Sequence, residues 1–265
     1  MQMRLLVSAL LLFSVNYAHA ADSCDISTII KHAWPDAKSS SEGFLTANGQ
    51  LIDIQGSSPQ SAICRVWPAH PELTLAAVPL MSPEQTDYDH TGDLELLVLD
   101  SSSLEVKQRL HLPGRMSDDA FRITGLALDT ARWKIAPDQT AFGLHVSRSG
   151  SSRVNPFSED ALSLYVIEND QLRILLEGIK LKESSGEWDG MCAGEFNDSK
   201  RFLAIDAASH NGYANIRVSE KSVDSTAYID ANGECTAKDK PGKASWLLRY
   251  NGKQYVVPEE LTPLP

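Results

Sequence analysis

Three of the four Asn-Gly pairs in this chain, each set between apolar runs, constrain its fold more than any other feature. They lie at 48–49, 232–233 and 251–252, inside the segments 43–56, 227–237 and 245–258. Asn and Gly both tolerate the positive φ angles that a type I′ turn requires. Each pair therefore predicts a β-hairpin, and the chain is expected to be rich in antiparallel strands.

Two longer hairpins are predicted at 94–110 and 162–178, and the two segments align without a gap. Each reads as an apolar strand, a polar turn and a second strand, and each is followed by another strand–loop–strand segment, at 125–146 and at 202–218. The pattern suggests two related four-stranded units at about 94–148 and 162–219. The alternative is that these are independent hairpins that share only turn chemistry.

Helical periodicity is confined to one segment near the N-terminus. In DISTIIKHAW, residues 25–34, Ile26, Ile29, Ile30 and Ala33 form an apolar stripe, and Pro35 follows. Asp22 or Ser23 is expected to cap the start of this helix. The expected fold is all-β and mainly antiparallel, a propeller-like or sandwich arrangement of meanders with one short N-terminal helix.

The first twenty residues have the pattern of a cleaved signal peptide. Arg4 precedes an apolar run at 5–15 that is too short to span a bilayer, and Ala-His-Ala follows at 18–20. Cleavage is expected after Ala20, which leaves residues 21–265 as one β-rich domain in the periplasm or outside the cell. The alternative is a retained anchor.

Four cysteines agree with an oxidising compartment. Three pairings of Cys24, Cys64, Cys192 and Cys235 are possible. Cys24–Cys64 and Cys192–Cys235 are favoured, because each closes a loop within its own end of the chain. A loop of this size would stabilise the fold by roughly 4 kcal/mol in the chain-entropy model.

The charge of the chain argues against nucleic acids and anionic membrane surfaces as partners. The formal net charge is −11, and loss of Arg4 with the signal peptide would make the protein more acidic still. Like charges repel a phosphate backbone and an anionic bilayer, so neither nucleic-acid binding nor membrane insertion is expected. An unknown protein or envelope component is the expected partner.

An acidic loop at 87–98 is the best candidate for calcium. Asp87, Asp89, Thr91 and Asp93 could supply several oxygens from one loop, although Val98 stands where a bidentate Glu is usual. A solvated polar turn is the favoured interpretation, so no cofactor is predicted.

This loop and the segment ASHNGYANIRV, residues 208–218, resemble FG-GAP-type repeats. That resemblance implies β-propeller blades, in which such loops often hold calcium. The second segment departs from the family pattern, since His210, Asn211 and Asn215 stand where carboxylates are expected.

The segment GEWDGMCAGEFNDSK, residues 186–200, holds the candidate catalytic groups Glu187, Asp189, Glu195 and Asp198. Two carboxylates that face one site can act as general acid and base. A disulfide-anchored connection with solvated acids is favoured. No G-x-S-x-G motif or paired-histidine metal motif stands elsewhere in the sequence.

The expected function is therefore non-catalytic binding by an exported β-domain, for example an inhibitor, an immunity-type protein or an assembly accessory. The alternative is an envelope hydrolase that uses the acids of residues 187–198.

Overall fold

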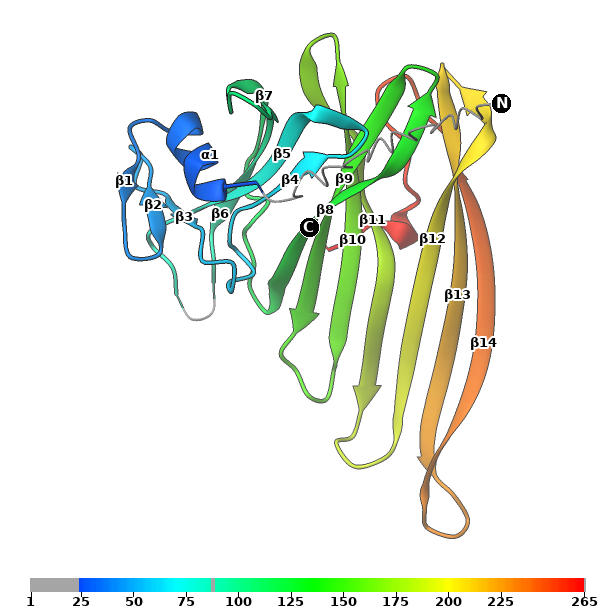
Figure 1. Ribbon diagram of the computed structural model, residues 1–265. Helices are drawn as coiled ribbons and strands as arrows, with labels where there is room; N and C mark the ends of the chain where they lie inside the picture. The colour runs from blue at the N-terminus through cyan, green and yellow to red at the C-terminus, as the bar shows by residue number, and fades with distance from the viewer. Residues whose placement is uncertain (1–23, 87–88, 265) are drawn as a thin grey trace, which may run out of the picture.

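The chain folds into two antiparallel sheets and one short helix (Figure 1). This computed structural model describes residues 24–86 and 89–264. Within these ranges the strands form two open seven-stranded sheets rather than the four-stranded blades of a propeller, so the all-β prediction is confirmed and its propeller-like version is not.

The first sheet uses the N-terminal half of the chain. Its strand order is β1-β2-β3-β5-β6-β7, and β4 pairs with β5. The strands are β1 (Lys38–Ser39), β2 (Gly43–Leu45), β3 (Leu51–Asp53), β4 (Ile63–Trp67), β5 (His70–Met81), β6 (Gly92–Asp100) and β7 (Val106–Leu112).

The second sheet is one continuous meander in which each strand pairs with the next along the chain. Its strands are β8 (Phe121–Ala136), β9 (Gln139–Gly150), β10 (Phe157–Glu168), β11 (Gln171–Trp188), β12 (Gly194–His210), β13 (Tyr213–Ile229) and β14 (Cys235–Leu248).

The four longer hairpins expected from the sequence all form, but they do not make two equivalent units. The pair β6–β7 belongs to the first sheet and β8–β9 to the second, so residues 94–148 are divided between the sheets. Residues 162–219 instead lie in the consecutive strands β10–β13 of one sheet.

The sheets pack together through aromatic and aliphatic side chains. The ring of Trp67 in β4 lies 5.4 Å from that of Phe142 in β9, and Phe142 lies 5.6 Å from Tyr165 in β10. Leu96 and Val98 of β6 join the same buried cluster. Because both sheets contribute to one core, they form a single structural unit.

Helix α1 (Ile26–Ala33) covers the other face of the first sheet, where Ile29 and Ile30 are fully buried. Its N-cap is Asp25, whose carboxylate accepts a hydrogen bond from Thr28 N at 3.2 Å. The cap therefore lies later than the expected Asp22 or Ser23, which fall outside the described residues. The disulfide Cys24–Cys64 ties the start of this helix to β4.

The C-terminal segment crosses the second sheet after β14. The pair Asn251-Gly252 makes only a short turn, with a bridge between Tyr250 and Tyr255, and not the longer hairpin expected over 245–258. A 3-10 helix, η1 (Glu259–Leu261), follows. Near the end of the segment, the carbonyl of Leu264 accepts a hydrogen bond from Arg148 Nη1 at 3.2 Å.

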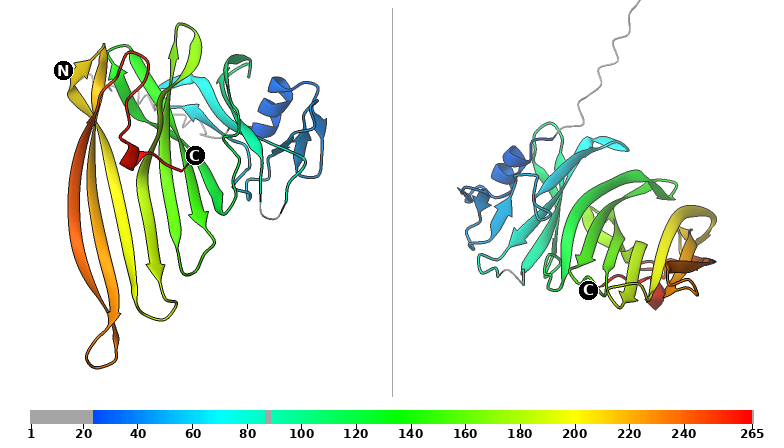
Figure 2. Two further views of the ribbon diagram at one scale, coloured as in Figure 1. Left: turned by 180° about the vertical axis from the view of Figure 1, so that it is seen from behind. Right: turned by 90° about the horizontal axis from the view of Figure 1, so that it is seen from below.

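Strands β11–β14 continue well beyond the packed part of the molecule (Figures 1 and 2). No residue of 182–202 or 219–245 belongs to any of the three hydrophobic clusters. At the far end, the disulfide Cys192–Cys235 joins the β11–β12 turn to the start of β14. Among the described residues, no helix is long and apolar enough to cross a membrane.

Candidate functional site

The two faces of the second sheet differ in what covers them. Successive side chains of a strand point to opposite faces. We call the face that carries Arg148, Glu159 and Arg201 the tail face, because Leu264 of the C-terminal segment contacts Arg148 there. The opposite face, which carries His145, Asp160 and Lys200, is the open face.

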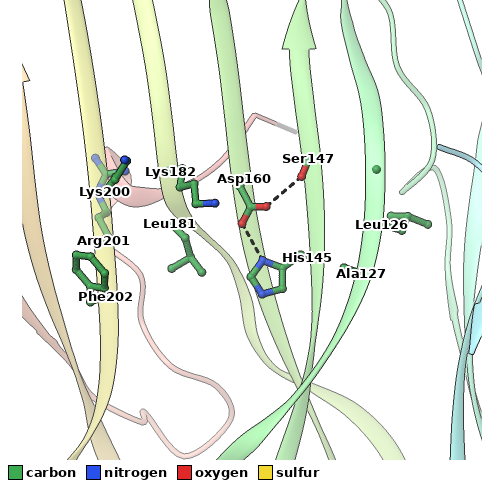
Figure 3. Close-up of a pocket in the computed structure, with 11 residues that line it drawn as sticks. Leu126, Ala127, His145, Ser147, Asp160, Leu181, Lys182, Lys200, Arg201 and Phe202 are labelled. Carbon is green, nitrogen blue, oxygen red and sulfur yellow. Dashed lines mark hydrogen bonds and ion pairs between the residues drawn. The ribbon is translucent and has the colours of Figure 1, made fainter. Parts of the chain in front are cut away.

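A histidine on the open face lies between two carboxylates, and Figure 3 shows one of them, Asp160, hydrogen-bonded to it. His145 Nδ1 is 2.7 Å from Asp160 Oδ1, and Nε2 is 3.7 Å from Asp129 Oδ2. Ser147 Oγ donates to the second oxygen of Asp160 at 3.0 Å. The three strands β8, β9 and β10 therefore each supply one charged group to the cluster.

This arrangement fixes the charges of the cluster. Hydrogen bonds to Asp129 and Asp160 raise the pKa of His145 to about 9, against the opposing effect of burial. Burial alone would raise the pKa of both carboxyls, but contacts that include the hydrogen bond to His145 hold each below its usual value. At neutral pH the cluster is an imidazolium between two carboxylates.

The cluster is therefore unsuited to act as a catalytic triad. A triad needs a neutral histidine that accepts the proton of the nucleophile. Here His145 is protonated, and Ser147 donates to Asp160 rather than to the imidazole. The geometry fits a structural and electrostatic role.

Beside the cluster the open face is hollowed. One hollow of about 400 Å³ continues from the histidine towards β12, and a second of about 320 Å³ adjoins it. Four residues contribute to the lining of both hollows: Ser147, Asp160, Lys182 and Lys200. The larger one also includes Phe202, whose ring is 59% exposed.

Four lysines continue from the hollows in a single row across the sheet. Lys182 pairs in register with Lys200, Lys200 with Lys221, and Lys221 with Lys243. All four are exposed and lie on the open face of β11–β14. We call these four residues the lysine row.

The carboxylates of residues 187–198 do not converge. Glu187 and Glu195 are direct cross-strand partners on the tail face, whereas Asp198 pairs with Ser184 on the open face. Asp189 lies in the turn and accepts hydrogen bonds from the amides of Met191 and Cys192, both at 2.8 Å. These bonds lower the pKa of Asp189.

Glu187 and Glu195 border a groove of about 460 Å³ on the tail face, but both side chains are exposed to solvent. The segment 186–200 is thus two strand ends and a tight turn within one sheet, anchored by the disulfide Cys192–Cys235.

The candidate calcium ligands of residues 87–98 form hydrogen bonds with different parts of the chain. Asp87 lies outside the described residues. Asp93 Oδ1 accepts from Gly114 N at 2.7 Å, and Asp89 and Thr91 make turn contacts with residues 82–86. Within the described ranges no cluster of three or more His, Cys, Asp or Glu side chains could hold a metal ion.

Sequence patterns alone do not identify His145 or the lysine row as a site. His145 could be placed on a face by alternation in β9, but its carboxylate partners come from two other strands. The four lysines occur one per strand, so only the register of three strand pairs brings them into line.

No family model, curated protein or solved structure matches this chain. The function is therefore inferred from the geometry of the second sheet.

Proposed function

We propose that this protein is an exported, non-catalytic binding protein that holds its partner on the open face of the second sheet. The observation that carries the proposal is the extension of β11–β14 past the hydrophobic clusters, with exposed side chains on the open face. Strands outside a core bury little apolar surface, so a role in contacting a partner accounts for them better than a role in stability.

Two disulfides support export, because such bonds persist in oxidising compartments. The signal-peptide pattern of residues 1–20 points the same way. A binding role is also supported by the protonated state of His145, which removes the most conspicuous histidine of the open face from use as a general base.

A photo-crosslinking amino acid at Phe202 tests the proposal, since this side chain is exposed at the rim of the larger hollow. The matched control carries the same amino acid at Thr226, an exposed position on the tail face of the projecting strands. After irradiation with cell-envelope extract, the Phe202 variant should form a defined adduct and the Thr226 variant should not.

Adducts from Thr226 alone would contradict the proposal, as would turnover of an envelope substrate by the purified protein. The alternative, an envelope hydrolase, rests on Glu187 and Glu195. It requires that Glu187→Gln abolish such turnover while the protein stays folded.

A further inference from the structure

We infer that the lysine row, Lys182, Lys200, Lys221 and Lys243, binds an acidic polysaccharide that lies across strands β11–β14. The inference rests on the proposed function and names the chemistry of the partner. Adjacent strands are about 4.8 Å apart, so the row presents four positive charges over roughly 14 Å.

The row is an unfavourable arrangement unless an anion is bound to it. Like charges on directly opposed residues of neighbouring strands destabilise a sheet. None of the four lysines forms an ion pair with another described residue. The chain carries 35 acidic residues against 24 Lys and Arg, so a scarcity of acidic residues does not explain this.

On the opposite face of the same strands, basic side chains are neutralised by ion pairs with glutamates. Arg201 lies beside Lys200, yet its side chain is buried on the tail face, 2.7 Å from Glu220 and 3.4 Å from Glu183. Glu183 also pairs with Lys180 at 2.8 Å. Glu183 and Glu220 directly adjoin row lysines in sequence but point to the other face, so neither of them forms an ion pair with the row.

The shape of the row favours a linear polymer. It is one residue wide, with Asp160 at its β10 end and Asp198 along one side, so a broad anionic surface such as a bilayer would meet repulsion from both acids. A polyuronate carries one carboxylate per sugar ring, and a ring is close in length to the strand spacing. Exposed Phe202, two residues from Lys200 on the same face, offers a surface on which a sugar ring can stack.

The two outer lysines provide the sharpest test, because their neighbours along the strands on the open face are uncharged: Ser219 and Val223 beside Lys221, and Pro241 and Ser245 beside Lys243. The test variant is Lys221→Gln/Lys243→Gln. The matched control is Lys238→Gln/Lys240→Gln, which removes the same charge from the tail face of β14.

Binding of polygalacturonate is measured by calorimetry at low ionic strength, with dextran as the uncharged polymer. The parent should bind polygalacturonate and not dextran, and added salt should weaken the binding. The test variant should bind about tenfold more weakly, whereas the control should match the parent. The melting temperature of the test variant should equal or exceed that of the parent, since like-charge repulsion is relieved.

The inference is overturned by absence of polygalacturonate binding, by equal binding of dextran, or by equal weakening in the two variants. Tighter, row-dependent binding to phosphatidylglycerol vesicles or to a single-stranded oligonucleotide would also overturn it. A face-specific adduct at Phe202 without polygalacturonate binding would leave the proposed function standing and reject the polysaccharide.

Discussion

At the scale of single residues, His145 couples the stability of the second sheet to pH. Its folded-state pKa of about 9 is above the usual 6.5, so its contribution is complete below about pH 6.5 and is lost as the pH rises through 9. The lowered pKa values of Asp129 and Asp160 add stability that is lost only as the pH falls below their usual 3.8.

The variant His145→Gln should therefore flatten the pH dependence of unfolding. We expect a loss of about 1 to 2 kcal/mol at pH 6, where the parent histidine is charged, and a much smaller loss at pH 9.5. Urea titrations at the two pH values measure the difference. His32→Gln on the exposed surface of α1 is the control, and an equal loss at both pH values in His145→Gln would contradict the prediction.

Two acids of the β11–β12 region should respond to substitution in opposite directions. Glu187 faces Glu195 directly, so Glu187→Gln removes a like-charge contact and should raise stability by about 0.3 kcal/mol. Asp189 accepts two amide hydrogen bonds, so Asp189→Ala should lower the melting temperature. Thermal melts of the two variants compare the signs, and a loss of stability in Glu187→Gln would contradict this account.

At the scale of elements, local sequence patterns are sufficient to predict the hairpins. They are insufficient to predict the sheet that each hairpin joins. Alternation and turn chemistry identified β6–β7, β8–β9, β10–β11 and β12–β13, because a hairpin is specified within about twenty residues. The division of the first two hairpins between sheets depends on long-range packing, such as that of Trp67 on Phe142. No sequence feature of the connection 113–120 indicates that the chain passes from the first sheet to the second there.

The residues of the candidate site could not be predicted from the sequence for a related reason. Strand alternation through residues 186–200 places Glu195 and Asp198 on opposite faces, which the acidic composition of the segment does not reveal. The lysine row depends on register across several strands, and a bulge between Asp160 and Ala161 shifts the pairing of β10 with β11. Such irregularities are not visible in a single sequence.

The disulfide at the far end of the sheet should have a local effect. Cys192–Cys235 closes a separation of 43 residues, which corresponds to about 4 kcal/mol in the chain-entropy model. The parts of the strands next to it, residues 182–202 and 219–245, belong to no hydrophobic cluster. Cys192→Ser/Cys235→Ser should therefore speed amide hydrogen exchange in residues 194–200 and 221–237 more than in β9 and β10.

The corresponding double variant at Cys24 and Cys64 is the control. It should loosen α1 and leave exchange in β12–β14 unchanged. Exchange at the far end that is the same in the Cys192→Ser/Cys235→Ser protein and the parent would show that the strands there hold together without the bond.

At the scale of the whole molecule, one shared core makes the two sheets interdependent. Trp67 is 1% exposed and contacts residues of both sheets. Trp67→Ala should cost about 3 to 5 kcal/mol, because it leaves a large cavity between the sheets. Circular dichroism and the fluorescence of the remaining tryptophans should then report one transition at a lower temperature.

Separate transitions for the two sheets in this variant would show that they fold independently. Phe202→Ala is the control, since this exposed ring lies outside the hydrophobic clusters and its removal should change the melting temperature little.

The position of Cys192–Cys235 also has a mechanical consequence. Under tension, a sheet fails where two strands can peel apart from a free end. Between β12 and β13 one end is closed by the turn at Asn211 and Gly212, and the disulfide bridges the other end through β14. If a bound polymer pulls on the projecting strands, β12 and β13 have no free end from which they can begin to separate, as long as the disulfide stays oxidised.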